Sequence, residues 1–188
     1  MSKDFRWGII GTGGIARTFA RDLAFTQGHV VAAVGSRELA KAETFAQEFN
    51  AAPYGSYEEL VQQEVDGVYV ATPHPMHAPN TILALENGKP VLCEKPLALS
   101  LAESRSMFNA ARANGAMLLE SYPYWFQPQT GDLVKQLTAT DGFGIGHVRS
   151  VHACFGFTVG NPETNIRMKP ELGGGALLDA GSYPLSLI

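Results

Sequence analysis

The chain has 188 residues, of which 45% are hydrophobic and 17% charged, and its formal net charge is −4. This composition is typical of a folded globular protein with a sizeable core, and mild acidity without any basic block argues against nucleic-acid binding. No apolar run approaches the ~18 residues of a membrane helix, and Cys93 and Cys154 have neither disulfide-framework nor metal-site spacing, so we expect a cytoplasmic protein without membrane contact or metal.

The N-terminal stretch 5–20 combines a predicted strand, a glycine turn and a predicted amphipathic helix. The turn fits the pattern G-x-G-x-x-A: the first glycine allows a sharp reversal, the second lets a pyrophosphate approach, and the alanine lets the helix pack closely. The start of the helix adds unpaired N–H groups and a positive dipole end. This context favours dinucleotide binding over a bare structural turn. The six residues of the turn are Gly11, Thr12, Gly13, Gly14, Ile15 and Ala16.

Further short apolar segments alternate with helical patterns along the chain. The predicted strands are 29–35, 51–54, 67–71, 90–93 and 116–119. The predicted helices are 17–25, 38–50, 56–63, 77–86 and 100–114, with capping boxes at Ser56-x-x-Glu59 and Ser100-x-x-Glu103. Such β–α alternation with continuously apolar strands predicts an α/β fold, a doubly wound parallel sheet of the Rossmann type.

Ser36 and Arg37 follow the second predicted strand. An acidic residue at this place would bind the 2′-hydroxyl of the NAD ribose. Serine removes the repulsion toward a 2′-phosphate, and arginine can bind that phosphate through a fork of charged hydrogen bonds. The pair therefore predicts NADP(H) rather than NAD(H). The alternative is that Arg37 is only a solvated residue at the start of the next helix.

The pattern changes after residue 121, and we expect two domains, 1–121 and 122–188. In the second, 131–137 predicts a helix, 147–157 alternates like an antiparallel strand with one exposed face, and 176–188 shows an apolar helical pattern. A lone strand does not stabilise itself. We therefore expect an α+β second domain, with an antiparallel sheet, that is incomplete in this chain.

Three motifs together resemble the Gfo/Idh/MocA family of NAD(P)-dependent oxidoreductases: GTGGIA at 11–16, Glu94-Lys95-Pro96, and GGGALLDAGSY at 173–183. Within that family, the chain resembles the branch of glucose–fructose oxidoreductases and dimeric dihydrodiol/D-xylose dehydrogenases, because it has tyrosine at position 183. Many other relatives have histidine there. The resemblance implies a Rossmann domain followed by a large open antiparallel sheet. It also implies that this chain is truncated and that the complete protein forms a homo-oligomer through the sheet.

Three residues are candidates for catalysis. Lys95 follows a parallel strand at the edge where ligands bind; by resemblance it hydrogen-bonds the reacting hydroxyl and the nicotinamide ribose, and Glu94 orients it. Tyr183 exchanges the substrate proton if the Lys95 ammonium lies close, because a cation favours the phenolate. Asp179, four residues before Tyr183, shares its helical face and positions substrate hydroxyls. A surface lysine, a core tyrosine and a capping aspartate are the alternatives.

Two further groups of residues belong to the expected site. By resemblance, the loop that carries Thr72, Pro73, His74 and His77 lines the nicotinamide side of the cofactor; the alternative for the histidines is an ordinary turn. The segment 120–128 departs from the family pattern, because Trp125 stands where the family often has arginine. Its aromatic residues form either a wall for the substrate or packing between domains.

These expectations describe an NADP(H)-dependent dehydrogenase or reductase that acts on the CH–OH or carbonyl group of a sugar or vicinal diol. Hydride would move to or from the nicotinamide while Tyr183 and Lys95 handle the proton. Two alternatives stay open: a truncated dinucleotide-binding sensor or interaction protein without turnover, and a structural fragment that binds nothing.

Overall fold

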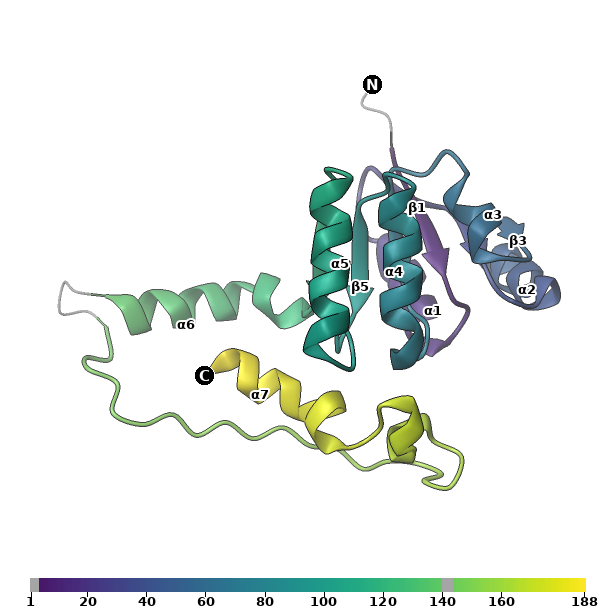
Figure 1. The fold of residues 1–188 in the computed structure, drawn as a ribbon. Coiled ribbons are helices and arrows are strands. Elements are labelled where there is room, and N and C mark those ends of the chain that lie inside the picture. The colour runs from purple at the N-terminus through teal and green to yellow at the C-terminus, as the bar shows by residue number, and fades with distance from the viewer. Residues whose placement is uncertain (1–3, 140–143) are drawn as a thin grey trace. The chain divides into compact units, whose positions relative to one another are not determined.

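The structure is a computed structural model that describes residues 4–139 and 144–188. The chain divides into two compact units, Met1–Ser121 and Tyr122–Ile188. Figure 1 labels the helices α1 to α7 and the strands β1, β3 and β5.

The first unit is built on a parallel sheet. Its strands lie in the order β3-β2-β1-β4-β5-β6, and every neighbouring pair is parallel. The strands are β1 Phe5–Ile10, β2 His29–Gly35, β3 Ala52–Tyr54, β4 Gly67–Val70, β5 Val91–Glu94 and β6 Leu118–Ser121. The order reverses between β1 and β4, which is the topological switch point where sheets of this class bind ligands. The predicted Rossmann α/β fold is confirmed.

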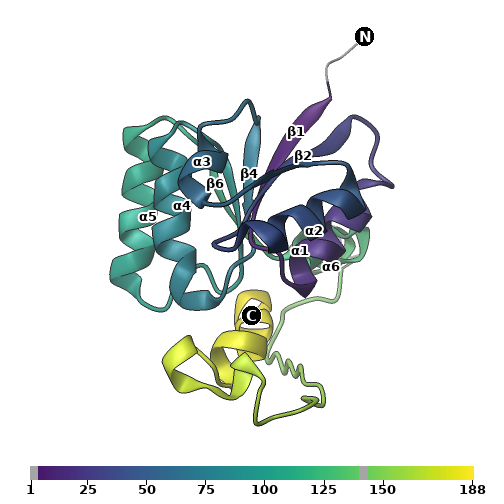
Figure 2. The same cartoon turned by 90° about the vertical axis from the view of Figure 1, so that its right-hand side faces the viewer.

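Helices cover both faces of this sheet. They are α1 Gly14–Leu23, α2 Leu39–Phe49, α3 Tyr57–Val61, α4 His77–Glu86 and α5 Leu101–Ala113, with a 3₁₀ turn His74–Met76 before α4. Figure 2 shows α1 and α2 on one face and α3, α4 and α5 on the other.

The core consists of two apolar clusters, one on each face of the sheet. Ile9 and Phe45 belong to the cluster under α1 and α2, whereas Ile10 and Leu85 belong to the cluster under α3, α4 and α5. Successive strand residues point to opposite faces, and therefore the continuously apolar strands supply both clusters. This double burial explains why the strands lack alternation in the sequence.

Two serines cap helices as the sequence predicts. The Ser56 hydroxyl accepts a hydrogen bond from the Glu59 backbone N–H at 3.1 Å, and the Ser100 hydroxyl accepts one from the Glu103 N–H at 3.2 Å. At the start of α5, a Glu103 carboxylate oxygen also accepts from the Leu99 N–H at 2.9 Å. Side chains therefore satisfy N–H groups that the first turn leaves unpaired.

We expect Ser100→Ala to lower the free energy of unfolding by about 1 kcal/mol, because the cap of α5 loses its acceptor. Urea denaturation of the chain measures this change. Ser106→Ala is the matched control, since Ser106 lies inside α5 and bonds only to its own helix at the Ala102 carbonyl. A loss of stability in the control equal to that in Ser100→Ala would contradict the capping role.

The second unit is described by itself. It contains a 3₁₀ turn Pro123–Phe126, α6 Pro128–Thr138, two further 3₁₀ turns Ile166–Met168 and Pro170–Leu172, a π-helical turn Leu177–Gly181 and α7 Ser182–Leu187. The helix expected over 131–137 is thus present and longer, and the pattern over 176–188 is helical but begins with the π turn. Across the described residues of both units, no helix combines the length and apolar character needed to cross a membrane.

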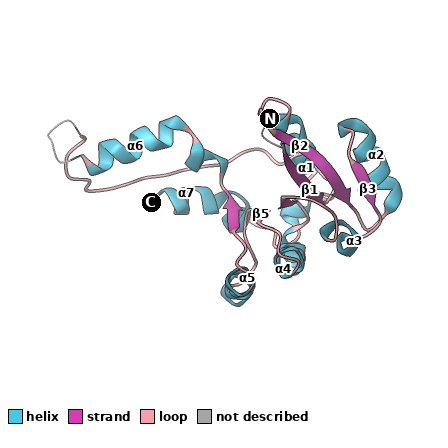
Figure 3. Ribbon diagram, turned by 90° about the horizontal axis from the view of Figure 1, so that it is seen from above, coloured by secondary structure: helices cyan, strands magenta, loops and turns pink. Residues whose placement is uncertain are grey.

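The strand predicted over 147–157 is wrong. These residues carry no strand, and Figure 3 draws them as loop. Alternation of polar and apolar residues reports which faces a strand would bury, but a strand also needs a neighbour for its N–H and C=O groups. Within the described part of the second unit no segment forms a strand to pair with it.

The glycine triplet 173–175 forms a tight turn that returns the chain to the turn at 166–168. The Gly174 N–H donates to the Lys169 carbonyl at 2.9 Å, and the Gly175 N–H donates to the Arg167 carbonyl at 2.8 Å. A Cβ on Gly174 would lie 2.6 Å from the Arg167 carbonyl oxygen, and Gly175 has φ +113°. Close backbone approach and left-handed backbone explain why the motif uses glycine.

Candidate cofactor and catalytic site

The glycine turn connects β1 to α1, and each of its small residues has a distinct role. Gly11 has φ +108°, and a Cβ there would lie 2.8 Å from the Ala71 carbonyl oxygen, so only glycine fits against the end of β4. Gly13 is the N-cap of α1 with φ −74°, and no described atom lies within 4 Å of the place its Cβ would take. Ala16 is fully buried in the core cluster. The turn therefore packs tightly against the end of β4 at Gly11 and leaves open space at Gly13, as phosphate binding requires.

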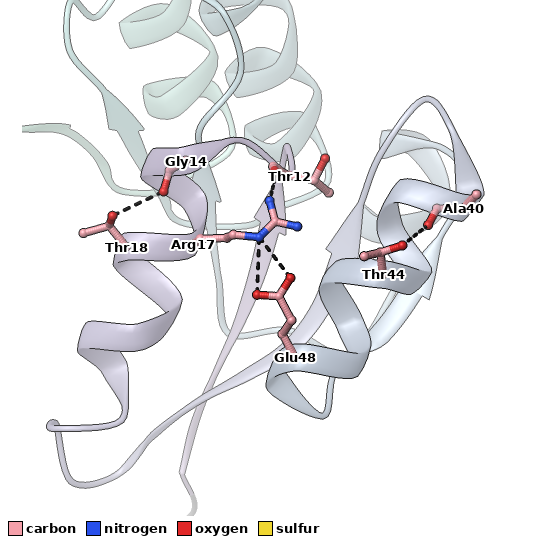
Figure 4. Close-up of polar contacts among 7 residues, drawn as sticks. All are labelled: Thr12, Gly14, Arg17, Thr18, Ala40, Thr44 and Glu48. Carbon is pink, nitrogen blue, oxygen red and sulfur yellow. Dashed lines mark hydrogen bonds and ion pairs between the residues drawn. The ribbon is translucent and has the colours of Figure 1, made fainter.

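Arg17 supports this turn, and the sequence analysis missed it. Its Nη1 donates to the Thr12 carbonyl at 2.5 Å, and its Nε donates to Glu48 on α2 at 3.0 Å (Figure 4). The guanidinium also lies over the Phe45 ring, 5.2 Å from its centroid. Arg17 thus ties the loop between β1 and α1 to the neighbouring helix.

Substitutions at Gly11 and Gly13 should affect different properties of the chain, stability in the first case and NADPH binding in the second. We expect Gly11→Ala to destabilise the fold by about 2 kcal/mol or more, because the methyl group meets the β4 backbone at a left-handed φ. Gly13→Ala should leave the melting temperature unchanged, since its Cβ meets open space, but weaken NADPH binding by about tenfold where the phosphate must approach. Thermal unfolding and fluorescence titration separate the two; equal loss of stability in both variants would contradict this account.

Ser36 and Arg37 lie at the carboxyl end of β2. Ser36 is 7% exposed, and its hydroxyl accepts a hydrogen bond from the Glu38 N–H at 3.3 Å. Arg37 lies beside a cavity of about 570 Å³ between the start of α3 and α4. Burial raises the pKa of the Tyr57 phenol in this cavity, and the neighbouring Arg37 guanidinium opposes that rise. A cation and a neutral phenol thus flank one hollow at the end of the second strand.

The loop after β4 turns several polar groups inward. Thr72 is buried, and its hydroxyl accepts a hydrogen bond from the Asn80 amide at 3.1 Å. His77, the first residue of α4, is 1% exposed, and both its ring nitrogens contact backbone carbonyls. Pro73 is exposed and His74 half-buried. His77 is therefore occupied within the protein, and the proposal that this loop lines the cofactor rests on its backbone and on Thr72, Pro73 and His74.

Lys95 directly follows β5 and is half-buried. Glu94, expected to orient it, accepts a hydrogen bond from the Tyr69 hydroxyl at 2.6 Å. Glu120 on β6, another residue that the sequence analysis gave no role, accepts one from the Leu97 N–H at 2.7 Å. The carboxylates of β5 and β6 therefore hold the strand end and the backbone after Lys95.

In the second unit, Asp179 forms an ion pair. The Arg167 Nε donates to an Asp179 carboxylate oxygen at 2.9 Å, and Asp179 is 5% exposed. The same guanidinium lies 5.6 Å from the centroid of the Phe157 ring. All three residues line a cavity of about 350 Å³ whose other walls include Phe155 and Met168. The Arg167 guanidinium offsets part of the cost of burying the Asp179 carboxylate, which lies at the wall of a largely apolar cavity.

Tyr183 lies in an aromatic cluster on α7. Its ring centroid is 5.2 Å from that of Tyr122, 5.8 Å from that of Tyr124 and 5.2 Å from that of Phe155. Tyr183 also lines a second cavity of about 130 Å³, which shares Phe155 with the cavity beside Asp179. Tyr122 and Tyr124 belong to the segment 120–128, which departs from the family pattern. They thus pack on Tyr183, the predicted catalytic tyrosine, within the same unit.

The two units divide the predicted site. The cofactor-binding residues and Lys95 belong to the first unit, and Asp179 and Tyr183 to the second. The pairing of Lys95 with Tyr183 therefore stays a prediction.

The buried thiol of Cys93 does not add to the chemistry of this site. Burial raises the pKa of the Cys93 thiol to about 12, so it stays protonated and unreactive at neutral pH, as expected of a buried thiol. In the described residues, no group of three His, Cys, Asp or Glu side chains is arranged to hold a metal ion.

Known proteins match the chain along its length. Residues 5–122 match the Gfo/Idh/MocA oxidoreductase family with its NAD-binding Rossmann fold, and residues 135–188 match the C-terminal domain of that family. The chain is 41% identical to trans-1,2-dihydrobenzene-1,2-diol dehydrogenase of Danio rerio, over 97% of this chain and 54% of that protein. It is 37% identical to D-xylose 1-dehydrogenase (NADP(+)) of Hypocrea jecorina, over 97% of this chain and 52% of that protein.

A solved structure agrees with these relatives. Aldose-aldose oxidoreductase of Caulobacter crescentus, complexed with glycerol, superposes with a TM-score of 0.85 at 30% identity, over 98% of this chain and 56% of that chain. The chain spans about half the length of the curated relatives that it matches. The family model covers most of the chain, including the glycine turn and Lys95, and the chain therefore belongs to the Gfo/Idh/MocA family of oxidoreductases.

Proposed function

We propose that this chain binds NADP(H) and forms part of an oxidoreductase acting on the CH–OH or carbonyl group of a sugar or vicinal diol. The observation that carries the proposal is the glycine turn at the end of β1, which is closed beneath Gly11 and open above Gly13. Ser36 and Arg37 at the end of β2 extend it, because serine and arginine stand at the position where an acidic residue would bind the ribose 2′-hydroxyl of NAD. The substrate class comes from relatives named for dihydrodiol and D-xylose dehydrogenation.

The residues present fit such a cofactor. The N–H groups at the start of α1 and the backbone of Gly13 would hold the pyrophosphate, and Arg37 the 2′-phosphate. The loop after β4 would face the nicotinamide. When bound, NADP(H) supplies the hydride acceptor or donor.

The remaining chemistry belongs to side chains of the chain itself. Lys95 would bind the reacting hydroxyl oxygen and stabilise negative charge that develops there. Tyr183 would give a proton to that oxygen or take one from it. Asp179, which pairs with Arg167, would accept hydrogen bonds from neighbouring substrate hydroxyls, and the apolar residues around it would pack against the ring face.

Two finer features belong to the same proposal. We infer a cytoplasmic location, which the free thiols Cys93 and Cys154 favour. The longer relatives also lead us to propose that the complete protein pairs with a second copy through its antiparallel sheet.

Titration with NADPH and NADH, followed by a turnover assay on a panel of aldoses and vicinal diols, tests the proposal. We expect NADPH to bind more tightly than NADH and its absorbance to change with a sugar or diol substrate. Binding without turnover would favour a dinucleotide sensor, and failure to bind either nucleotide would overturn the proposal.

A further inference from the structure

His77 joins two segments that the sequence keeps apart. Its Nε2 lies 2.8 Å from the carbonyl oxygen of Thr72, in the loop after β4, and its Nδ1 lies 2.7 Å from the carbonyl oxygen of Pro96, in the loop after β5. The ring is buried, and His77 is the first residue of α4. One side chain therefore spans the carboxyl ends of two neighbouring strands of the sheet.

The chemistry of the two contacts is unusual. Backbone carbonyl oxygens only accept hydrogen bonds, and a neutral imidazole has one N–H to donate, so only the doubly protonated ring donates to both. Burial lowers the pKa of His77, and the charges of His74 and Lys95 lower it further, while the carbonyls of Pro96 and Thr72 act in the opposite direction. A singly protonated ring therefore donates to one of the two carbonyls, and its second nitrogen lies against the other carbonyl without a proton between them.

Both loops carry residues of the predicted site. Pro96 directly follows Lys95, and Thr72 is also held through its hydroxyl by Asn80, one turn along α4 from His77. The position of the Lys95 backbone is thus tied through His77 to the loop proposed to face the nicotinamide.

We infer that His77 is a positioning residue, which couples the loop after β4 to the backbone beside Lys95 and so sets the spacing of the two across the cofactor site. It acts through these carbonyls and need not touch the cofactor. The inference rests on the proposed function in one respect, because it takes Lys95 and the loop at Thr72 to face NADP(H).

Three variants separate positioning from general stability. His77→Phe keeps a ring but removes both contacts. We expect it to weaken NADPH binding by about tenfold, the change in affinity that the loss of one hydrogen bond causes. His77→Gln keeps a donor and should recover part of that loss. The control is His29→Phe, which removes the ring nitrogen that accepts from the Trp7 indole N–H at 3.2 Å, and should lower the melting temperature without changing the NADPH dissociation constant.

A second measurement works on the chain without nucleotide. Long-range ¹H–¹⁵N NMR spectra follow both nitrogens of His77 through a pH titration, and the backbone amide of Lys95 is followed in the same samples. We expect the His77 ring to titrate below the ordinary histidine range and the Lys95 amide shift to move with it.

The outcomes are distinguishable. If the wild-type chain fails to bind NADPH, the proposed function falls, while the coupled NMR titration still tests the link. If His77→Phe binds NADPH as the wild type does, the inference is overturned. It is also overturned if the chemical shift of the Lys95 amide stays constant while His77 titrates.

Discussion

Replacing Tyr183 with phenylalanine, or Lys95 with methionine, is expected to lower the rate of hydride exchange by about 10²–10⁴-fold, the usual contribution of a positioned acid or base. Phenylalanine keeps the ring and its contacts with Tyr122 and Phe155, so the fold should be preserved. Methionine keeps the length of the lysine stem and removes its charge. Steady-state turnover with the best sugar or diol found for the wild type measures both effects, and NADPH titration shows whether the cofactor still binds.

Tyr124→Phe is the matched control for Tyr183→Phe. Tyr124 belongs to the same aromatic cluster, and its hydroxyl bonds to the Ser186 hydroxyl at 2.6 Å. It has no predicted part in proton transfer, and we therefore expect turnover close to that of the wild type. Equal loss of turnover in the two tyrosine variants would assign the effect to packing and remove Tyr183 from the mechanism.

Arg37→Ala is expected to weaken NADPH binding by about ten- to a hundredfold, because one or more charged hydrogen bonds to the 2′-phosphate are lost. NADH has no such phosphate, so its dissociation constant should stay the same. Isothermal titration with both nucleotides measures the difference. Ser36→Asp should go further and reverse the preference, since a carboxylate at this position repels the phosphate and accepts from the ribose 2′-hydroxyl.

Arg21→Ala is the control for charge alone. Arg21 is an exposed arginine in the last turn of α1, outside the residues that line the cavity beside Arg37. Its removal should change NADPH and NADH binding equally and slightly. If Arg37→Ala behaves in the same way, Arg37 is a solvated residue and the assignment to NADP(H) loses its support.

The first unit was predictable because its signals are local. Glycine at a positive φ, serine at a helix start and uninterrupted apolar strands each report the structure of their own few residues, and the structure confirms them at Gly11, Ser56 and Ser100. The parallel order then follows from β–α alternation.

The supporting residues of the site were not predictable in this way. Arg17, Tyr57 and Asn80 act on segments that lie beside them only after folding, and no spacing in the sequence marks such contacts. For His77 the sequence predicted that its loop lines the cofactor, and this stays a prediction. Its two carbonyl partners come from the ends of two different strands, and they became visible only in three dimensions.

The second unit shows the opposite limit. The glycine triplet and the segment around Tyr183 were recognised as motifs, whereas the alternation over 147–157 led to a strand that does not form. A helix forms its backbone hydrogen bonds within one segment, and therefore the apolar pattern of that segment is enough to predict it. A strand depends on a partner elsewhere in the chain, and alternation carries no information about that partner.

The most direct test of the account is a crystal structure of the chain with NADP⁺ bound. We predict the pyrophosphate over Gly13 at the start of α1, the 2′-phosphate within hydrogen-bond distance of Arg37, and the nicotinamide between Lys95 and the Tyr183 hydroxyl. A nucleotide bound elsewhere, or one whose nicotinamide lies far from either of these two side chains, would contradict it.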